Sequence, residues 1–523
     1  MQAEGILRTS FKVAFYHRLD GDDYSPLSAS TATATDVRTA QEEKTAAPLG
    51  RYFRRFTLQN VRTFRSPVVL DFCHSDGTVA QWTVILGENG TGKTTLLQYL
   101  AGMMPVQDRD LGNLPAKTKS GNKPLPFRPL VSTEDWIQWH VENLPLYWIK
   151  PMKMEAKLEV SCSAQSFADA SANKAQPFGF QFIADHTVDG RPTIKFQFTG
   201  VDSVPFYEEF RLFGYGASRH IAGPASPYLT SETFFQNGGS SPVSTIFHDD
   251  HPLISPEQWF FSLDHSAARS TGKAADRLTR ALKSVSRCLT NSLPDVREIV
   301  VGPHGYITGK QIMSLLCSVP YSPRPLPFRA LSVGYRTMAA WLTDFIKRMH
   351  DAFPNLDEPD NGPAVVLIDE FDLHMHPAWQ RKAMAALSRE FPNTQFIVTA
   401  HSPLVVQAAN MERAKILVLQ RRKRDDGLEE VVVVDHPSET AGWRVDQILE
   451  SLYRVSADSP RYEEVSRERV RLRQKEKLTA VEKRQLAAIE VELEQLTPPD
   501  EAEASKALLS DLKKALEKAC GEK

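Results

Sequence analysis

Gly87-Glu-Asn-Gly-Thr-Gly-Lys-Thr94 is the stretch that decides the fold of this chain. The pattern G-x-x-x-x-G-K-[ST] stands between Thr83–Leu86, an apolar run that predicts a buried strand, and Thr94–Leu100, which predicts a helix. Glycines let consecutive backbone N–H groups curl around an anion, and the start of the helix adds positive potential. The sequence therefore predicts a phosphate-binding loop between a strand and a helix, which is a local unit of α/β folds.

The polar residues of this loop have expected roles in holding a nucleoside triphosphate. Lys93 would reach the β and γ phosphates, and the hydroxyl of Thr94 can bind Mg²⁺. We therefore predict a nucleotide site that uses Asn89, Gly90, Thr91, Gly92, Lys93, Thr94 and Thr95, with Thr94 also a metal ligand.

Two carboxylates follow another apolar run further along the chain. Val365–Ile368 predicts a buried strand, and Asp369 and Glu370 come directly after it. In phosphoryl transfer, one carboxylate can hold the magnesium shell and another can polarise the attacking water. An apolar strand that ends in Asp-Glu is common by itself. Downstream of a phosphate loop, it predicts a metal ligand at Asp369 and a catalytic base at Glu370.

Two further segments belong to the same pattern. Thr394–Thr399 predicts a second strand, and His401 after it could reach a γ-phosphate oxygen from the carboxyl end of that strand. Leu331-Ser-Val-Gly-Tyr335 opens a predicted helix, where Ser332 and Gly334 could bind an anion or serve only as a helix cap. The predicted catalytic set is Lys93, Glu370 and His401, and Ser332 and Gly334 join the nucleotide-binding set.

In chain order, these elements resemble an ABC-type ATPase head of the SMC, RecF and OLD group. Under this resemblance GENGTGKT is the Walker A motif, LSVGY the signature and LIDE the Walker B motif, and His401 is the switch histidine. Asp372–Pro377 looks like the D-loop of that group. The resemblance implies that the chain binds ATP and Mg²⁺. It also implies head-to-head dimers, with each ATP held between one subunit's Walker A and the other's signature.

Softer motifs extend the resemblance. Asn60-Val-Arg-Thr-Phe64 is similar to an element that contacts adenine and phosphate in such heads, which makes Arg62 a nucleotide-binding candidate. FGYGASR at Phe213–Arg219, SPEQWFFSLD at Ser255–Asp264 and GWRVDQILESLY at Gly442–Tyr453 resemble the ATPase subunits of Septu and related retron defence systems. That likeness implies an ATP-driven switch that senses phage infection and controls a separate effector. The expected effector is an HNH-type nuclease.

Composition excludes several other classes of protein. Of the 523 residues, 41% are apolar and 24% are charged, so wholesale disorder is excluded. A net charge of -2 excludes a chain-wide basic character, and DNA or RNA would have to bind a local patch. Apolar runs fall short of the roughly 18 residues of a membrane span. The first residues show no basic region followed by a long apolar run, so we do not expect secretion. The five cysteines are scattered, which indicates reduced thiols, so we expect a cytoplasmic protein without a membrane partner.

The pattern along the chain predicts an α/β protein of three parts. Residues 1–50 would form an N-terminal arm or linker. Residues 51–440 would form the ATPase head, with a β-rich lobe, a phosphate-loop sheet and a helical signature lobe inserted at about 250–355. Residues 441–523 would form a helical region that docks a partner.

Two local patterns predict where helices begin. Ser255-Pro-Glu-Gln258 combines an N-cap serine with proline at the first helical position. Thr479-Ala-Val-Glu482 predicts a capping box, in which two side chains satisfy each other's backbone N–H groups. The second helix would form one arm of a charged hairpin.

Other functions fit the sequence less well. A transporter ATPase would have its signature much closer to the phosphate loop than Leu331 is to Lys93. An SMC protein would carry a long heptad insertion, whereas prolines and glycines interrupt this chain. An OLD-type nuclease would need a set of metal-binding carboxylates after His401, where only Asp435 ends a predicted strand.

The prediction is therefore an ATP-switched dimer, an ATPase that is not itself a nuclease and that controls a separate one. A RecF-like DNA-repair ATPase that binds DNA stays open as an alternative. So does a scaffold that binds ATP with negligible turnover, because residue types alone do not separate slow hydrolysis from none.

Overall fold

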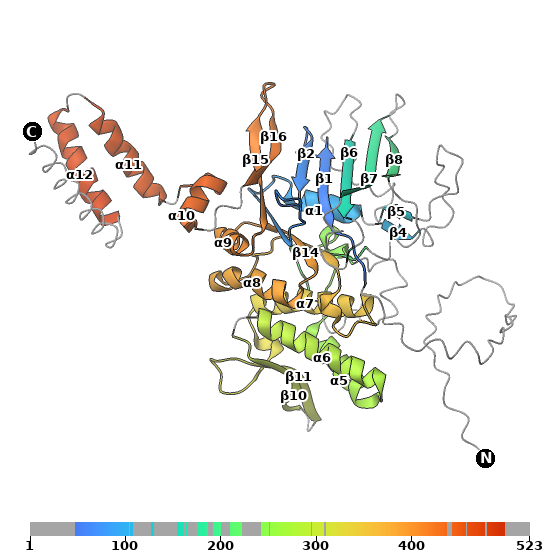
Figure 1. Cartoon of the computed structure of the whole chain (residues 1–523). Helices are drawn as coiled ribbons and strands as arrows, with labels where there is room; N and C mark the ends of the chain where they lie inside the picture. Colours follow the sequence, from blue (N-terminus) through green and yellow to red (C-terminus); the bar gives the residue numbers. More distant parts are fainter. Residues whose placement is uncertain are drawn as a thin grey trace, which may run out of the picture. The chain divides into compact units, whose positions relative to one another are not determined.

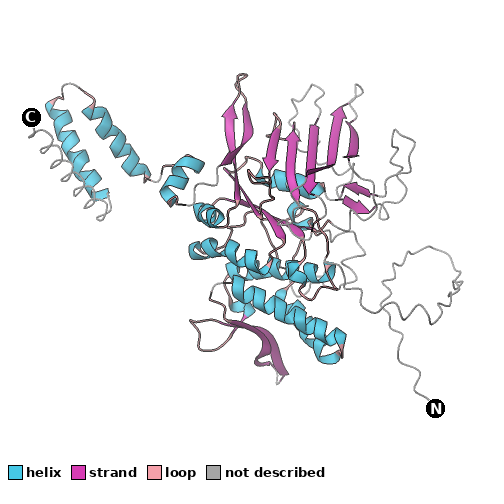
Figure 2. Cartoon of the chain, viewed as in Figure 1, coloured by secondary structure: helices cyan, strands magenta, loops and turns pink. Residues whose placement is uncertain are grey.

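Helices and strands alternate along most of the described chain, which confirms the predicted α/β fold class (Figures 1 and 2). The computed structural model describes residues 48–103, 105–107, 127–129, 154–161, 164, 175–186, 192–199, 210–221, 242–249, 251–293, 295–307, 310–436, 442–456, 458–475 and 478–496. The predicted N-terminal arm, 1–50, lies outside these residues except for 48–50, as does the C-terminal region beyond 496.

A six-stranded sheet in the order β16-β15-β3-β14-β13-β9 lies at the centre of the head. Its neighbouring strands run parallel, except for the antiparallel edge pair β15 and β16. All residues of β3, β9, β13 and β14 are buried, as expected for parallel strands covered on both faces. The strands are β3 (Trp82–Gly87), β9 (Leu212–Tyr215), β13 (Ala364–Ile368), β14 (Thr394–Ala400), β15 (Lys415–Lys423) and β16 (Glu429–His436).

Parallel pairing brings the carboxyl ends of β3, β13 and β14 to one edge of this sheet. Ala400 at the end of β14 pairs with Leu86, and Val398 pairs with Ile368. The phosphate loop, the Asp369–Glu370 turn and His401 follow these three strand ends. The strand register therefore places segments that are far apart in the sequence next to one another.

Different helices cover the two faces of the central sheet. Strand alternation puts Trp82 and Val84 into one apolar core with the helices α5–α9, and Ile85 into another with α1 and the β-rich lobe. Trp82 stacks on Phe396 of β14, with ring centroids 4.2 Å apart. The helices are α1 (Lys93–Gly102), α4 (Ser244–Phe247), α5 (Pro256–Arg269), α6 (Lys273–Ser292), α7 (Val333–Ala352), α8 (Pro377–Glu390) and α9 (Pro403–Met411), with short 3-10 turns η4 (Phe328–Ala330) and η5 (Pro359–Asn361).

An antiparallel sheet in the order β2-β1-β6-β7-β8 forms the second lobe, as the β-rich sequence pattern predicts. The side chain of Gln395 joins it to the central sheet. Its Oε1 accepts a hydrogen bond from the Phe53 N–H at 2.8 Å, and its Nε2 donates to the Phe53 carbonyl at 2.9 Å. The strands are β1 (Phe53–Gln59), β2 (Val68–Asp71), β6 (Met154–Ser161), β7 (Ala175–His186) and β8 (Pro192–Thr199), and β4 (Pro105–Gln107) pairs with β5 (Phe127–Pro129).

The predicted helical lobe contains a three-stranded sheet that the sequence patterns above do not predict. The first helix is as expected, since Ser255 is the N-cap of α5 and Pro256 follows at the first helical position. After α6, however, β10 (Glu298–Ile307), β11 (Lys310–Ser318) and β12 (Leu326–Pro327) pair in that order. Ile299 is buried, whereas Val300 next to it is 39% exposed. This alternation is typical of a half-buried strand, and it is the sequence pattern that could have predicted β10.

The described residues between 442 and 496 form α10 (Val445–Ile448), a π-helical turn at Leu449–Tyr453, α11 (Pro460–Arg473) and α12 (Ala480–Leu496). The predicted capping box is present: Thr479 N donates to Glu482 Oε2 at 2.9 Å, and Glu482 N donates to Thr479 Oγ1 at 3.3 Å. The hairpin of α11 and α12 encloses a small apolar core of Val465, Leu472, Ile489 and Leu493.

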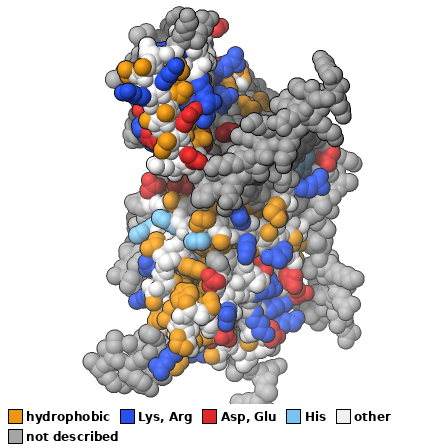
Figure 3. Space-filling view, turned by 90° about the vertical axis from the view of Figure 1, so that its left-hand side faces the viewer, with side chains coloured by type: hydrophobic (Ala, Val, Ile, Leu, Met, Phe, Trp, Pro, Cys, Tyr) orange, Lys and Arg blue, Asp and Glu red, His pale blue; other side chains and the backbone are white. Residues whose placement is uncertain are grey.

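Charged residues of the hairpin pair across it. Arg461 bonds Glu492 at 2.7 Å and Arg473 bonds Glu490 at 2.5 Å. Figure 3 shows basic and acidic side chains interspersed over the described part of one face of the molecule. These pairs indicate a solvated hairpin rather than a basic stripe for nucleic acid. Among the described residues, the helices are too short or too polar to cross a membrane.

Candidate nucleotide-binding site

The phosphate loop has the backbone that its glycines make possible. Gly90 and Gly92 have φ of 76° and 94°, in the left-handed region that favours glycine. A Cβ at Gly92 would lie 2.8 Å from the ring of Phe64. The loop can therefore curl tightly at the start of α1.

Lys93 lies in the centre of this loop and is only 7% exposed. Its Nζ donates to the carbonyl oxygens of Gly87 at 2.8 Å and Glu88 at 3.0 Å. Burial lowers the pKa of Lys93, and the nearby Asp369 and Glu370 oppose that shift. The ammonium group is thus held by oxygen acceptors that phosphate oxygens can replace.

Asp369 at the end of β13 connects two of the predicted segments. Its Oδ2 accepts a hydrogen bond of 2.6 Å from the hydroxyl of Thr94, and its Oδ1 accepts one of 2.5 Å from Thr399 Oγ1. A hydroxyl and a carboxylate therefore converge at the mouth of the loop. Oxygen donors of this kind are the ligands that Mg²⁺ prefers, so Thr94 and Asp369 fit the metal predicted for them.

Glu370 occupies a strained position in the turn after β13. Its φ is 47°, which is unusual for a residue with a side chain. Its N–H donates to Thr399 Oγ1 at 2.7 Å. Such conformations persist where neighbouring groups hold them, and they are common at functional sites.

His401 is fixed through its backbone. Its N–H donates to both carboxylate oxygens of Asp372, at 3.2 and 3.1 Å. Asp372 belongs to the D-loop-like segment, so this contact joins the end of β14 to the turn after β13. In the same segment, Nδ1 of His376 accepts from Ala378 N at 3.3 Å, which is a helix-cap role.

Arg62 also lies beside the loop. Its Nη1 donates to Thr95 Oγ1 at 3.0 Å in the first turn of α1. Burial lowers the pKa of this half-buried guanidinium. The structure thus brings together the predicted residues of the loop, Arg62, Asp369 and Glu370.

Gly334 contacts a different segment, and Ser332 lies two residues before it. Ser332 is the exposed N-cap of α7, and a Cβ at Gly334 would lie only 2.3 Å from the carbonyl oxygen of His374. Only glycine allows this close approach. The signature end of α7 therefore packs against the D-loop-like segment of its own chain, and the hydrogen bonds described above for Lys93 and Thr94 do not include it.

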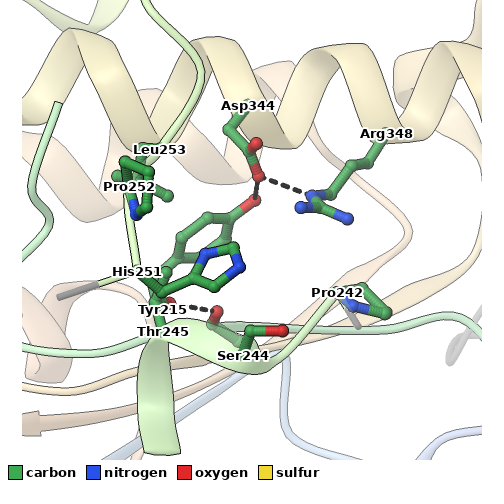
Figure 4. A pocket seen from close by; sticks show the side chains of 10 residues that line it. Tyr215, Pro242, Ser244, Thr245, His251, Pro252, Leu253, Asp344 and Arg348 are labelled. Atoms are coloured by element: carbon green, nitrogen blue, oxygen red, sulfur yellow. Dashed lines mark hydrogen bonds and ion pairs between the residues drawn. The ribbon is translucent and has the colours of Figure 1, made fainter. Parts of the chain in front are cut away.

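A buried network joins α7 to the edge of the central sheet (Figure 4). The hydroxyl of Tyr215 on β9 donates to Asp344 Oδ2 at 2.9 Å, and Nε of Arg348 donates to the same oxygen at 2.6 Å. Burial, with Asp344 nearby, raises the pKa of Tyr215 well above its ordinary value, so the phenol stays protonated and donates. The helix that begins at the signature is thereby fixed to the strand beside β13.

Three residues at this site are absent from the predicted set. Thr399 bonds Asp369 and Glu370, and Arg219 donates to the backbone carbonyls of both. Arg421 of β15 donates from Nη2 to the carbonyl of Asn89 at 3.0 Å. Their roles depend on strand register, since Leu419 of β15 pairs with Gly87. Of these three residues, only Arg219 belongs to a motif noted in the sequence, FGYGASR.

Comparisons with known proteins match parts of this chain. The family model "AAA domain, putative AbiEii toxin, Type IV TA system" matches residues 322–407, which span the signature, the Walker B strand and His401. The retron Vc95 probable ATPase of Vibrio cholerae serotype O1 biovar El Tor is 45% identical over 87 residues, 17% of this chain and 17% of that protein. The Septu protein PtuA of Bacillus mycoides (strain KBAB4) is 22% identical over 403 residues, 77% of this chain and 45% of that protein.

A solved structure of an SMC head bound to the C-winged helix domain of ScpA has a TM-score of 0.37 and 14% sequence identity, over 74% of this chain and 99% of that chain. The named relatives confirm the predicted resemblance to the ABC-type ATPases of retron and Septu defence systems. The chain spans less than half of the length of these two curated relatives.

Arg421 gives a test of the phosphate loop. In a planar peptide the carbonyl and the N–H point in opposite directions. A hydrogen bond from the Arg421 guanidinium to the Asn89 carbonyl therefore turns the N–H of Gly90 away from Arg421. We expect Arg421→Ala to weaken ATP binding about fivefold, the effect of losing a half-exposed charged hydrogen bond. Calorimetric titration measures this affinity. Arg422→Ala is the control, because strand alternation directs its side chain to the opposite face. Equal affinities in both variants would contradict a role for Arg421.

Proposed function

We propose that this chain binds and hydrolyses ATP, and that two copies enclose two ATP molecules to form a switch. The observation that carries the proposal is the pair of hydrogen bonds that Asp369 makes to Thr94 and Thr399. Together they unite the phosphate loop, the carboxylate turn and the strand before His401 at one sheet edge. A phosphate loop with a carboxylate pair at its mouth is suited to phosphoryl transfer.

In the proposed reaction, Lys93, Glu370 and His401 have separate roles. Lys93 exchanges the carbonyls of Gly87 and Glu88 for phosphate oxygens. Glu370 polarises the attacking water, and His401 contacts the γ-phosphate from the end of β14. A magnesium ion at Thr94 and Asp369 would offset negative charge on the phosphates.

The site would be completed by a second copy of the chain. Ser332 is the N-cap residue of α7, and backbone N–H groups and the helix dipole at such a helix start attract an anion. It is exposed, so it is suited to meet the γ-phosphate held by a partner. ATP would thereby favour the dimer over the separate copies.

We further propose that the dimer controls a separately encoded HNH-type nuclease in bacterial defence and cuts nothing itself. The names of the relatives, a Septu protein and a retron ATPase, support a defence role. The helical hairpin offers a surface for such a partner, since Val470, Val481 and Val491 are 49%, 73% and 57% exposed. Apolar side chains on a helix suit docking of another helix.

The assigned roles of Glu370 and Lys93 predict opposite defects. Glu370→Gln should bind ATP like the wild type and hydrolyse it about 10²–10⁴-fold more slowly, the usual effect of removing a general base. Lys93→Ala should lose ATP binding itself, because its ammonium group holds the phosphates. Steady-state turnover and a nucleotide titration on both variants measure this. Wild-type turnover in Glu370→Gln would refute the assignment.

The division of labour with a nuclease has its own test. The purified chain, given Mg²⁺ or Mn²⁺ and ATP, should leave plasmid and single-stranded DNA intact, and cleavage should require the protein encoded beside it. Asp435→Asn serves as a matched variant, since Asp435 is the carboxylate at the end of β16. Strong cleavage by the wild-type chain alone, lost in Asp435→Asn, would overturn the proposal.

A further inference from the structure

The FGYGASR segment ends in a buried guanidinium that the proposed reaction has not yet used. Arg219 is 2% exposed. Its Nη2 donates to the carbonyl oxygens of both Asp369 and Glu370, and its Nε donates to the carbonyl of Gly216 at 3.2 Å. These partners are all backbone oxygens, so Arg219 acts on the shape of the turn rather than on a carboxylate directly.

The charge of Arg219 is costly to bury and is offset by the carboxylates of the site. A guanidinium away from water is unfavourable unless opposite charge lies close by. Asp369, Asp372 and Glu370 supply that charge, and they raise the pKa of Arg219 while burial lowers it to about 10. An apolar side chain would fill the same space without needing opposite charge close by. The charge is therefore suited to a functional role in addition to packing.

Arg219 and Thr399 hold the carboxylate turn from opposite sides. Arg219 takes the carbonyl oxygens of Asp369 and Glu370, while the N–H groups of Glu370 and Phe371 donate to Thr399 Oγ1 at 2.7 Å and to the Thr399 carbonyl at 2.8 Å. Between them, Glu370 keeps its φ of 47°. Without Arg219, the turn would relax toward a common backbone conformation and Glu370 would move.

The segment that carries Arg219 is itself rigid. A Cβ at Gly216 would lie 2.0 Å from the carbonyl oxygen of Thr245, so the backbones touch there. Tyr215, one residue earlier, is fixed to Asp344 and Arg348 of α7, as Figure 4 shows. Arg219 is thus held by a strand end that is anchored on two sides.

We propose that Arg219 is a positioning residue for hydrolysis: it holds the Asp369–Glu370 turn so that Glu370 meets the attacking water. This inference rests on the proposed ATP hydrolysis and adds a residue to it. Lys93 bonds the carbonyls of Gly87 and Glu88, and the side chain of Asp369 is held by Thr94 and Thr399, so we expect ATP to bind without Arg219. Loss of Arg219 should therefore lower the rate of hydrolysis and leave the affinity for nucleotide unchanged.

The test compares Arg219→Met with Arg287→Met in the full chain. Both variants remove an arginine that bonds oxygen acceptors of the protein, but the partners of Arg287 are Asp360 and Glu390, outside the carboxylate turn. We expect Arg219→Met to lower kcat about 100-fold, the effect of misplacing a reacting group by about 1 Å, with the Kd for ATP unchanged within twofold. Arg287→Met should keep kcat within a few fold of the wild type. Thermal unfolding of both variants compares their stability.

Arg219→Lys keeps the inference testable if the methionine variant does not fold. Lysine keeps the charge but lacks the planar fork that bonds two carbonyls, so kcat should still fall at least tenfold at unchanged ATP affinity. A wild-type kcat in the folded Arg219 variants, with Glu370→Gln inactive, would overturn this inference alone. Equal losses of kcat and ATP affinity would overturn it as well. Wild-type hydrolysis by Glu370→Gln would instead refute the proposed function.

Discussion

The hydrogen bond of 2.6 Å between the Thr94 hydroxyl and Asp369 is the contact on which the rest of the site depends. It joins residues 275 positions apart and exists only because β14 lies between β3 and β13 in parallel register. That register requires strands buried on both faces, which the helices on one side and α1 with the β-rich lobe on the other provide. The two apolar cores thus serve the site by fixing which strand ends meet.

A second consequence of this constraint is that the polar groups of the site are held in place. Lys93 is bound by loop carbonyls, Glu370 sits in a left-handed turn, and His401 is bonded to Asp372. The left-handed turn is unfavourable in isolation and persists because the contacts with the neighbouring strand hold it. The buried Tyr215–Asp344–Arg348 network extends this rigidity to α7. A rearrangement at the nucleotide would therefore be transmitted to the signature end of that helix, as a switch requires.

Local patterns predicted the parts of the fold that depend on neighbouring residues. The glycine loop between Thr83–Leu86 and α1, the strand before Asp369 and the capping box at Thr479 all depend on spacing within a few residues. The sheet β10-β11-β12 was missed because its alternation lies between two stronger helical patterns. Arg219 and Arg421 could not be placed from sequence, since their partners at Asp369 and Asn89 are reached only through strand register. Gly334 was recognised as part of a pattern, but its contact with His374 became visible only in three dimensions.

The central claim is that ATP at this sheet edge joins two copies of the chain. Sedimentation of the Glu370→Gln variant tests it most directly, because slow hydrolysis would preserve the ATP-bound state. With ATP and Mg²⁺, the account predicts twice the chain mass of 58.7 kDa, and without nucleotide the single mass. Adding Ser332→Arg to the same variant should return the single mass in ATP, since a long charged side chain would block the helix start. A mass that is the same with and without ATP would contradict the account.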